Sequence, residues 1–123
     1  MSFDVGIDLV DFGQIEESLA RHGERFMNRV FSTGECLESR GHTAALAARF
    51  AAKEATMKAL RRTDEGIGWR SIEVLDGTGG GPVIKLSGAA AQLAAARGVS
   101  ALRVSMTTER RQAAAIVVAE AAR

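Results

Sequence analysis

The sequence predicts an α+β domain in which one strand is followed by a run of helices and then mostly by strands. Three observations carry this prediction. A short segment with β-branched residues, FDVGIDLV at 3–10, opens the chain as a strand. Residues 43–61 are dense in Ala and Leu and hold no Gly or Pro, which favours one long helix. Residues 101–107 alternate between polar and apolar side chains, and residues 112–119 form a continuous apolar run, as strands do.

The helices before the long one have recognisable start signals. Asp11 is expected to cap a helix over residues 12–22. Residues 24–31 place apolar side chains at helical spacing. Ser32 or Thr33 begins a further helix, because glutamates follow at the spacing of a capping box.

The long helix is expected to be capped by Thr43. Its large apolar side chains lie along one stripe, which we expect to face the core: Leu46, Phe50, Met57 and Leu60. A polar loop with glycines follows at 63–68.

The C-terminal half predicts a hairpin of residues 72–75 and 82–86, joined by a glycine-rich turn at 77–81. This turn lacks the Gly-Lys-Ser/Thr ending of a P-loop and the GxGxxG order of a dinucleotide loop, so we do not interpret it as a phosphate cradle. A short alanine-rich helix starts at residue 87 or 88, and an exposed turn at 110–111 joins the last two strands. The final strand is expected to be buried because it is apolar throughout.

The composition is that of an ordinary globule, with 123 residues, 46% hydrophobic and 25% charged. We expect one domain over residues 1–123. The net charge of +1 argues against a nucleic-acid binder, and no apolar run reaches the roughly 18 residues of a membrane span. Asp4 and Asp8 interrupt the first apolar stretch, so no signal peptide is expected, and the single cysteine fits the cytoplasm. So small a domain has little material to enclose a deep pocket.

Two carboxylates stand out by their context: Asp8 lies within an apolar strand, and Glu54 lies on the long helix. The plain interpretation is that Asp8 accepts hydrogen bonds at a strand end and that Glu54 forms a surface ion pair with Lys58 four residues later. The functional interpretation requires the two carboxylates to meet with a magnesium ion between them. Arg49, Lys53 and Lys58 would then supply positive charge for a phosphate.

The basic group Arg61, Arg62 and Arg70 leaves two interpretations open. It is either a solvated helix end or a surface for an acidic protein partner.

Four segments, in order along the chain, resemble the holo-acyl-carrier-protein synthase family of small stand-alone 4′-phosphopantetheinyl transferases: GIDLV, RFMNRVFSTGE, LAARFAAKEATMKAL and GIGWRSIEVL. The resemblance implies the 4′-phosphopantetheinyl transferase fold, with a long helix packed on a small, mostly antiparallel sheet. It implies transfer of the 4′-phosphopantetheine group of coenzyme A to a serine of an apo acyl carrier protein, with release of adenosine 3′,5′-bisphosphate. It also implies a homotrimer with the active site between neighbouring subunits.

The resemblance further implies roles for individual residues. Asp8 and Glu54 are expected to hold Mg²⁺ together with the coenzyme A pyrophosphate. Lys58 is expected near the phosphates as a candidate for proton transfer, and Glu54 acting through a bound water is the alternative. Arg49 and Gly66 are expected to contact coenzyme A.

Two positions depart from the family pattern. Thr108 stands where the family has a histidine near coenzyme A, so it is expected to contact the nucleotide through a hydroxyl without positive charge. Gln14 stands where the family has an arginine for the carrier protein, and Arg21, Arg25 or Arg61 are candidates to compensate. These departures motivate an alternative, a degenerate member that binds carrier protein or coenzyme A without efficient transfer. The carrier is expected to come from fatty-acid, polyketide or peptide synthesis.

Overall fold

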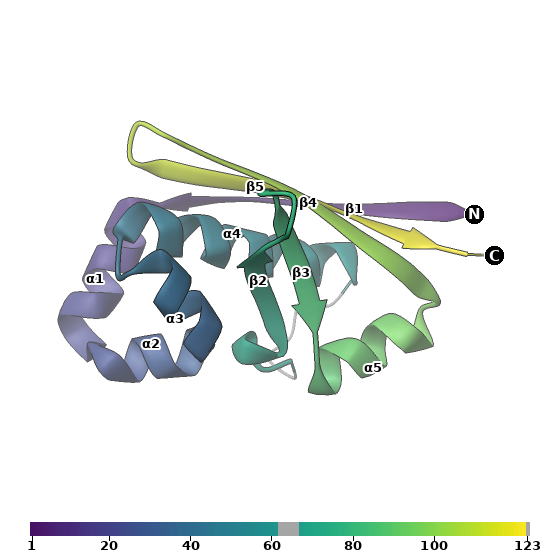
Figure 1. The fold of residues 1–123 in the computed structure, drawn as a ribbon, viewed down its shortest axis with the longest axis horizontal. Coiled ribbons are helices and arrows are strands. Elements are labelled where there is room, and N and C mark those ends of the chain that lie inside the picture. The colour runs from purple at the N-terminus through teal and green to yellow at the C-terminus, as the bar shows by residue number, and fades with distance from the viewer. Residues whose placement is uncertain (62–66, 123) are drawn as a thin grey trace.

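A three-stranded antiparallel sheet forms one side of the molecule in a computed structural model that describes residues 1–61 and 67–122. Its strand order is β1 (Ser2–Asp11), β5 (Gln112–Ala121) and β4 (Val99–Glu109), so the last strand along the chain is the central one. Helix α4, the longest helix, packs along one face of this sheet (Figure 1).

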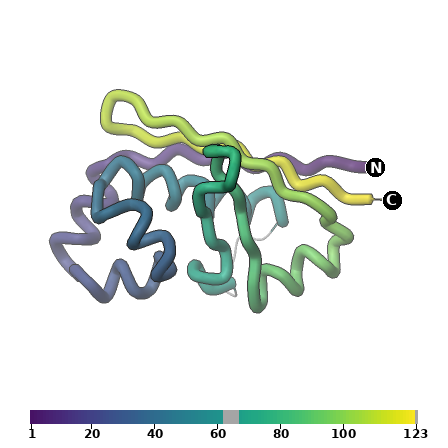
Figure 2. The backbone as a smooth tube through the Cα atoms, viewed as in Figure 1, coloured from purple at the N-terminus to yellow at the C-terminus, as the bar shows by residue number. Residues whose placement is uncertain are grey.

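The remaining elements surround α4. Figure 1 shows α1, α2 and α3 at one end of α4, and the β2–β3 hairpin and α5 nearer its other end. The tube in Figure 2 shows that both chain termini lie at the same end of the sheet. The elements are α1 (Phe12–His22), α2 (Glu24–Val30), α3 (Thr33–Ser39), α4 (Thr43–Ala59), η1 (Trp69–Ser71), β2 (Ile72–Asp76), β3 (Pro82–Leu86) and α5 (Gly88–Ala96). The α+β class expected from the sequence is therefore confirmed.

The helix starts follow the expected capping chemistry in two cases and depart from it in one. Asp11 and Ser32 each form a capping box, with Gln14 and Glu35 as the reciprocal partners. The expectation that Thr43 caps α4 is wrong, because Thr43 is already helical. The cap position belongs to His42, whose backbone is extended and whose side chain makes no capping hydrogen bond.

Helix α4 packs on the sheet through alanines. The alanines at 47, 51, 52 and 55 are all 0% exposed. Of the large apolar stripe expected from the sequence, Leu46 and Leu60 are buried, whereas Phe50 and Met57 are only partly buried. Short side chains let the helix axis approach the sheet closely, and β1 lies directly against the backbone of α4 at Gly6. A Cβ built on Gly6 would lie 1.9 Å from the carbonyl oxygen of Ala55.

Within residues 1–61 and 67–122, helices cover one face of the sheet and leave the other largely exposed. The inward residues of β5 are almost completely buried, but Ile116 on the outer face is 40% exposed. The expectation of a buried final strand is therefore wrong for the outer face of β5, because the described helices pack against its inner face. The outer face of β1 is also apolar, and its four side chains are between 57% and 63% exposed: Phe3, Val5, Ile7 and Leu9.

The two turns expected from the sequence are present. In the glycine-rich turn, Gly77 donates its N–H to the carbonyl oxygen of Gly81 at 2.7 Å, and Gly80 has a φ of 89°. Arg110 and Arg111 have φ of 51° and 63°, which fits the two-residue hairpin turns that favour the strand twist. The polar loop expected at 63–68 lies largely outside the described residues, and so do Arg62 and Gly66. Within the described ranges, no helix is both long and apolar enough to cross a membrane.

We expect the substitution Gly6→Ala to destabilise the protein by about 3 kcal/mol, because the added methyl group would collide with the backbone of α4. Urea denaturation monitored by circular dichroism measures the change. Gly13→Ala is the matched control, since a Cβ there meets only the Asp11 side chain at 3.4 Å. Equal stability of the two variants would show that β1 and α4 do not approach as closely as described.

Candidate functional site

A polar cluster lies where β1 runs along α4. Lys58 donates a hydrogen bond to Asp8 Oδ1 at 2.8 Å and another to the carbonyl oxygen of Ile7 at 3.0 Å. The Asp8 side chain is 15% exposed and that of Lys58 is 50% exposed, so the pair is reachable from solvent. The ion pair of Lys58 within the described chain is thus with Asp8 on β1, and not with Glu54 one turn away on its own helix.

Glu54 lies half-buried beside this pair. Burial raises the pKa of the Glu54 carboxyl, the negative charge of Asp8 raises it further, and Lys58 partly opposes both effects. The hydrogen bond to Asp8 raises the pKa of Lys58, and the charges of Asp8 and Glu54 add to this effect. The structure therefore brings together the three predicted residues, with a lysine that is positively charged at neutral pH.

The oxygen atoms of Asp8 and Glu54 suit a hard divalent cation. Carboxylates are preferred ligands of Mg²⁺, which commonly keeps several waters and binds phosphate oxygens as well. The effect of Asp8 on the pKa of Glu54 shows that the two negative charges are close enough to repel, and a cation would relieve that repulsion. Within the described chain, no group of three or more His, Cys, Asp or Glu side chains gathers. The two carboxylates would therefore share the ion with water and phosphate.

Arg49 lies on a different side of α4. Nine residues separate it from Lys58, which places the two side chains about 180° apart around the helix. The Arg49 guanidinium contacts Glu38 Oε1 at 2.9 Å and Asp76 Oδ1 at 3.8 Å, and its side chain is only 8% exposed. Its Nε atom is buried without a hydrogen-bond partner among the described residues. The single chain does not bring Arg49 to the Asp8 cluster.

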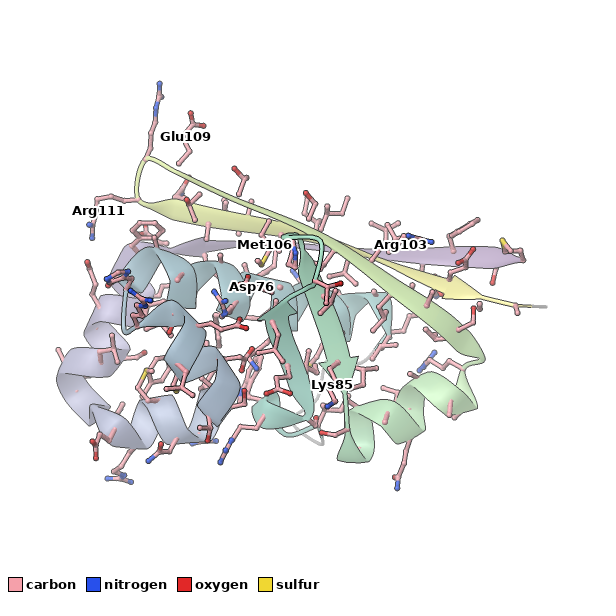
Figure 3. All side chains as sticks on the ribbon, in the orientation of Figure 1. Asp76, Lys85, Arg103, Met106, Glu109 and Arg111 are labelled. Atoms are coloured by element: carbon pink, nitrogen blue, oxygen red, sulfur yellow. The ribbon has the colours of Figure 1, made fainter. Side chains whose placement is uncertain are left out.

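Thr108 is an exposed residue near the end of β4, where it pairs with Ala113 of β5. Figure 3 labels its neighbour Glu109 and shows it beside the turn at the far end of the sheet from α5. The other residue expected to bind coenzyme A, Gly66, lies outside the described residues.

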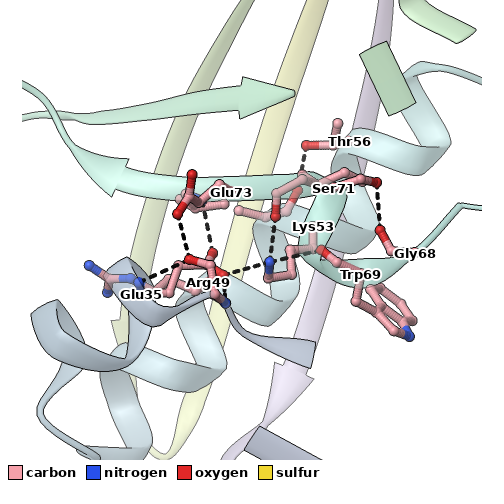
Figure 4. Close-up of polar contacts among 12 residues, drawn as sticks. Glu35, Arg49, Lys53, Thr56, Gly68, Trp69, Ser71 and Glu73 are labelled. Carbon is pink, nitrogen blue, oxygen red and sulfur yellow. Dashed lines mark hydrogen bonds and ion pairs between the residues drawn. The ribbon is translucent and has the colours of Figure 1, made fainter. Parts of the chain in front are cut away.

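The sequence interpretation of Lys53 as a phosphate-binding cation is wrong. Its side chain is 0% exposed, and its ammonium group lies 2.7 Å from Glu35 Oε1 (Figure 4). From the sequence, Glu35 is expected only as a capping residue at a helix start, with no contact to Lys53. Eighteen residues separate them, and nothing in their local pattern indicates the contact.

A basic surface is formed where α1 meets α2. A shallow hollow of about 190 Å³ is lined by His22, Arg25, Phe26 and Arg29. Gln14, on α1, accepts a hydrogen bond from the backbone N–H of Asp11 at 3.1 Å, so part of its side chain serves the helix cap.

The chain matches the family model of the 4′-phosphopantetheinyl transferase superfamily over residues 4–117. It is 46% identical to a holo-acyl-carrier-protein synthase of Methylobacterium sp. (strain 4-46), with 100% of this chain and 97% of the relative covered. It is 40% identical to the enzyme of that name from Desulforudis audaxviator, over 97% of this chain and 93% of the relative. The protein therefore belongs to the 4′-phosphopantetheinyl transferase superfamily.

Solved structures agree with this family assignment. The fold matches an acyl carrier protein synthase from Chronobacterium ammoniagenes in complex with coenzyme A, with a TM-score of 0.88, 30% identity and complete coverage of both chains. It also matches the holo-acyl-carrier-protein synthase of Neisseria meningitidis, with a TM-score of 0.87, 31% identity and coverage of 95% of this chain and 97% of the other. The expected single-domain transferase fold is confirmed.

We expect Glu54→Gln to raise the melting temperature at about pH 7.5, well above the ordinary pKa of a glutamate. A raised pKa means that the folded chain disfavours the ionised form of Glu54. The free energy of unfolding therefore falls as the pH rises from about 4.3, the unfolded-state pKa, through the higher folded-state pKa. Scanning calorimetry of metal-free protein at about pH 4 and pH 7.5 measures the difference. A lower melting temperature for the variant at the higher pH would contradict the strained carboxylate.

Proposed function

We propose that the protein is a holo-acyl-carrier-protein synthase, which transfers 4′-phosphopantetheine from coenzyme A to a serine hydroxyl of an apo acyl carrier protein. The observation that carries the proposal is the cluster of Asp8, Glu54 and Lys58 on a chain of this family. A degenerate member that only binds its partners would have no need of two repelling carboxylates beside a lysine.

The reaction forms a bond between the serine oxygen and the β-phosphorus of coenzyme A, and breaks the pyrophosphate bond to release adenosine 3′,5′-bisphosphate. Asp8 and Glu54 would hold Mg²⁺, which when bound spreads the negative charge of the phosphates. Lys58 carries a positive charge in this structure, so we assign it to the phosphate oxygens. We assign the serine proton to Glu54 acting through a water, because Lys58 is charged and engaged by Asp8 and so has no free lone pair to accept it.

The contacts proposed for the nucleotide are those of Arg49, Gly66 and Thr108. Since Arg49 and Lys58 lie on opposite sides of α4, one coenzyme A molecule that touches both would bridge two copies of the chain. This geometry supports an active site between neighbouring subunits.

The outer face of β1 supports such an assembly. Four large apolar side chains in a row are exposed on it, together with Ile116 of β5. A continuous apolar face of this kind is typical of a protein–protein interface. We propose that copies of the chain associate through this face; the number three rests on the family resemblance.

The basic surface between α1 and α2 supports docking of the carrier. His22, Arg25 and Arg29 line one hollow together with Phe26, a combination that suits an acidic helix with one apolar anchor. In this proposal Gln14 takes little part, because its side chain holds the N-terminus of α1. We propose the cytoplasm as the location, which the single cysteine favours.

We expect Glu54→Gln and Lys58→Met each to lower transfer by about 100-fold or more, because the first removes a proposed ligand of Mg²⁺ and the second removes positive charge beside the phosphates. The assay incubates coenzyme A and Mg²⁺ with apo carriers from fatty-acid, polyketide and peptide synthesis and measures their intact masses. Lys85→Met, an exposed lysine on β3, is the matched control and should keep wild-type activity. Unchanged transfer by Glu54→Gln refutes the metal assignment, and no mass gain with wild type on any carrier overturns the proposed function.

We expect Ile7→Lys to dissociate the assembly and to reduce transfer, because it places a charge within the apolar face. Analytical ultracentrifugation together with the mass assay measures both effects. Leu37→Lys is the control, since Leu37 is 73% exposed but lies on α3 away from the sheet. A monomeric Ile7→Lys variant with full activity would rule out a site shared between subunits.

A further inference from the structure

A buried ion pair joins α3 to α4 (Figure 4). Its lysine is five residues before Lys58, which places it about 140° around the helix from the Asp8 cluster. Lys53 and Glu35 are both 0% exposed. Besides Glu35 Oε1, the ammonium group of Lys53 donates to the carbonyl oxygen of Trp69 at 3.0 Å and to that of Ile72. An ammonium group has three protons, so each of them has an acceptor.

The carboxylate of Glu35 extends the connection to β2. Its Oε1 also accepts the backbone N–H of Ser32 at 2.9 Å, and its Oε2 accepts the backbone N–H of Val74 at 2.8 Å. The Ser32 hydroxyl donates to Glu73 Oε2 at 2.6 Å, a second link to the same strand. One buried network therefore connects α3, α4, η1 and β2.

This network is placed to set the rotation of α4 about its axis. The face that α4 turns to the sheet consists of alanines, whose short side chains offer few ridges to interlock with β1 and β5. Hydrogen bonds are directional, so the three bonds of Lys53 restrict the helix more than the alanine contacts do. Glu54 is the next residue, about 100° around the helix, so any rotation that displaces Lys53 also moves Glu54 relative to Asp8.

Stability alone does not explain a pair of this kind. Burying two charges costs about as much as their attraction returns, and apolar replacements of similar size are often as stable or more so. We propose that Lys53 and Glu35 are positioning residues for the transfer reaction, which hold α4 at the rotation where Glu54 and Lys58 face Asp8. This inference rests on the proposed function.

The test replaces the pair by apolar side chains of similar size in the double variant Glu35→Leu/Lys53→Met. Thr56→Val is the matched control, because Thr56 is also buried on α4 but its hydroxyl donates only to the Ala52 carbonyl oxygen within the same helix. The measurements are the melting temperature, kcat and KM for coenzyme A, and a crystal structure of each variant.

We expect a folded double variant whose kcat falls by about tenfold or more while KM changes by less than about threefold, because misplacement acts mainly on the transition state. Its crystal structure should show Lys58 Nζ beyond the roughly 4 Å limit of an ion pair with Asp8. The Thr56→Val control should keep wild-type kcat and the ion pair.

A folded double variant with wild-type kcat and an intact Asp8–Lys58 pair overturns the positioning role. If the double variant does not fold, the same measurements on Glu35→Gln test the positioning role. This substitution keeps the side-chain size and removes the charge. Absence of transfer by the wild type would overturn the proposed function alone. The positioning role would still be tested by the crystal structures, which show whether the Asp8–Lys58 ion pair is kept.

Discussion

The close approach of β1 to α4 is the constraint on which the rest of the structure depends. It requires a residue without a side chain at Gly6 and a helix face built of alanine. Because side chains alternate along a strand, Asp8 faces the helix two residues after Gly6 and meets Lys58 there. The same packing feature that closes the core therefore also assembles the candidate site.

Two lysines only five residues apart on α4 have opposite environments. Lys58 is half-exposed beside Asp8 and is held in its charged form by that contact. Lys53 is wholly buried, and burial lowers its pKa although Glu35 opposes the effect. The first has a charge available to a phosphate, whereas the second has all three protons engaged within the protein. Helix geometry separates the two roles, because five residues turn the side chain by about 140°.

Two features of the single chain have no role within its own candidate site: the exposed apolar face of the sheet, and Arg49, which lies away from the Asp8 cluster. The outer face of the sheet, centred on Ile7 and Ile116, is exposed in the single chain. Arg49 lies on the side of α4 opposite Lys58, where it forms ion pairs with Glu38 and Asp76. The described residues cover one face of the sheet and leave large apolar side chains of the other face exposed. A site shared between copies would use both features.

Local chemistry explains what could be predicted from the sequence. Caps such as Asp11 and Ser32, the glycine-rich turn and the strand patterns involve residues a few positions apart. The segments that resemble a known family pointed to Asp8, Glu54 and Lys58 as candidate site residues. The tertiary structure alone decided that Lys53 is buried against Glu35, that Lys58 pairs with β1, and that Ile116 on the outer face of β5 stays exposed among the described residues. These depend on which elements meet in space, and contacts between distant segments leave no local pattern in one sequence.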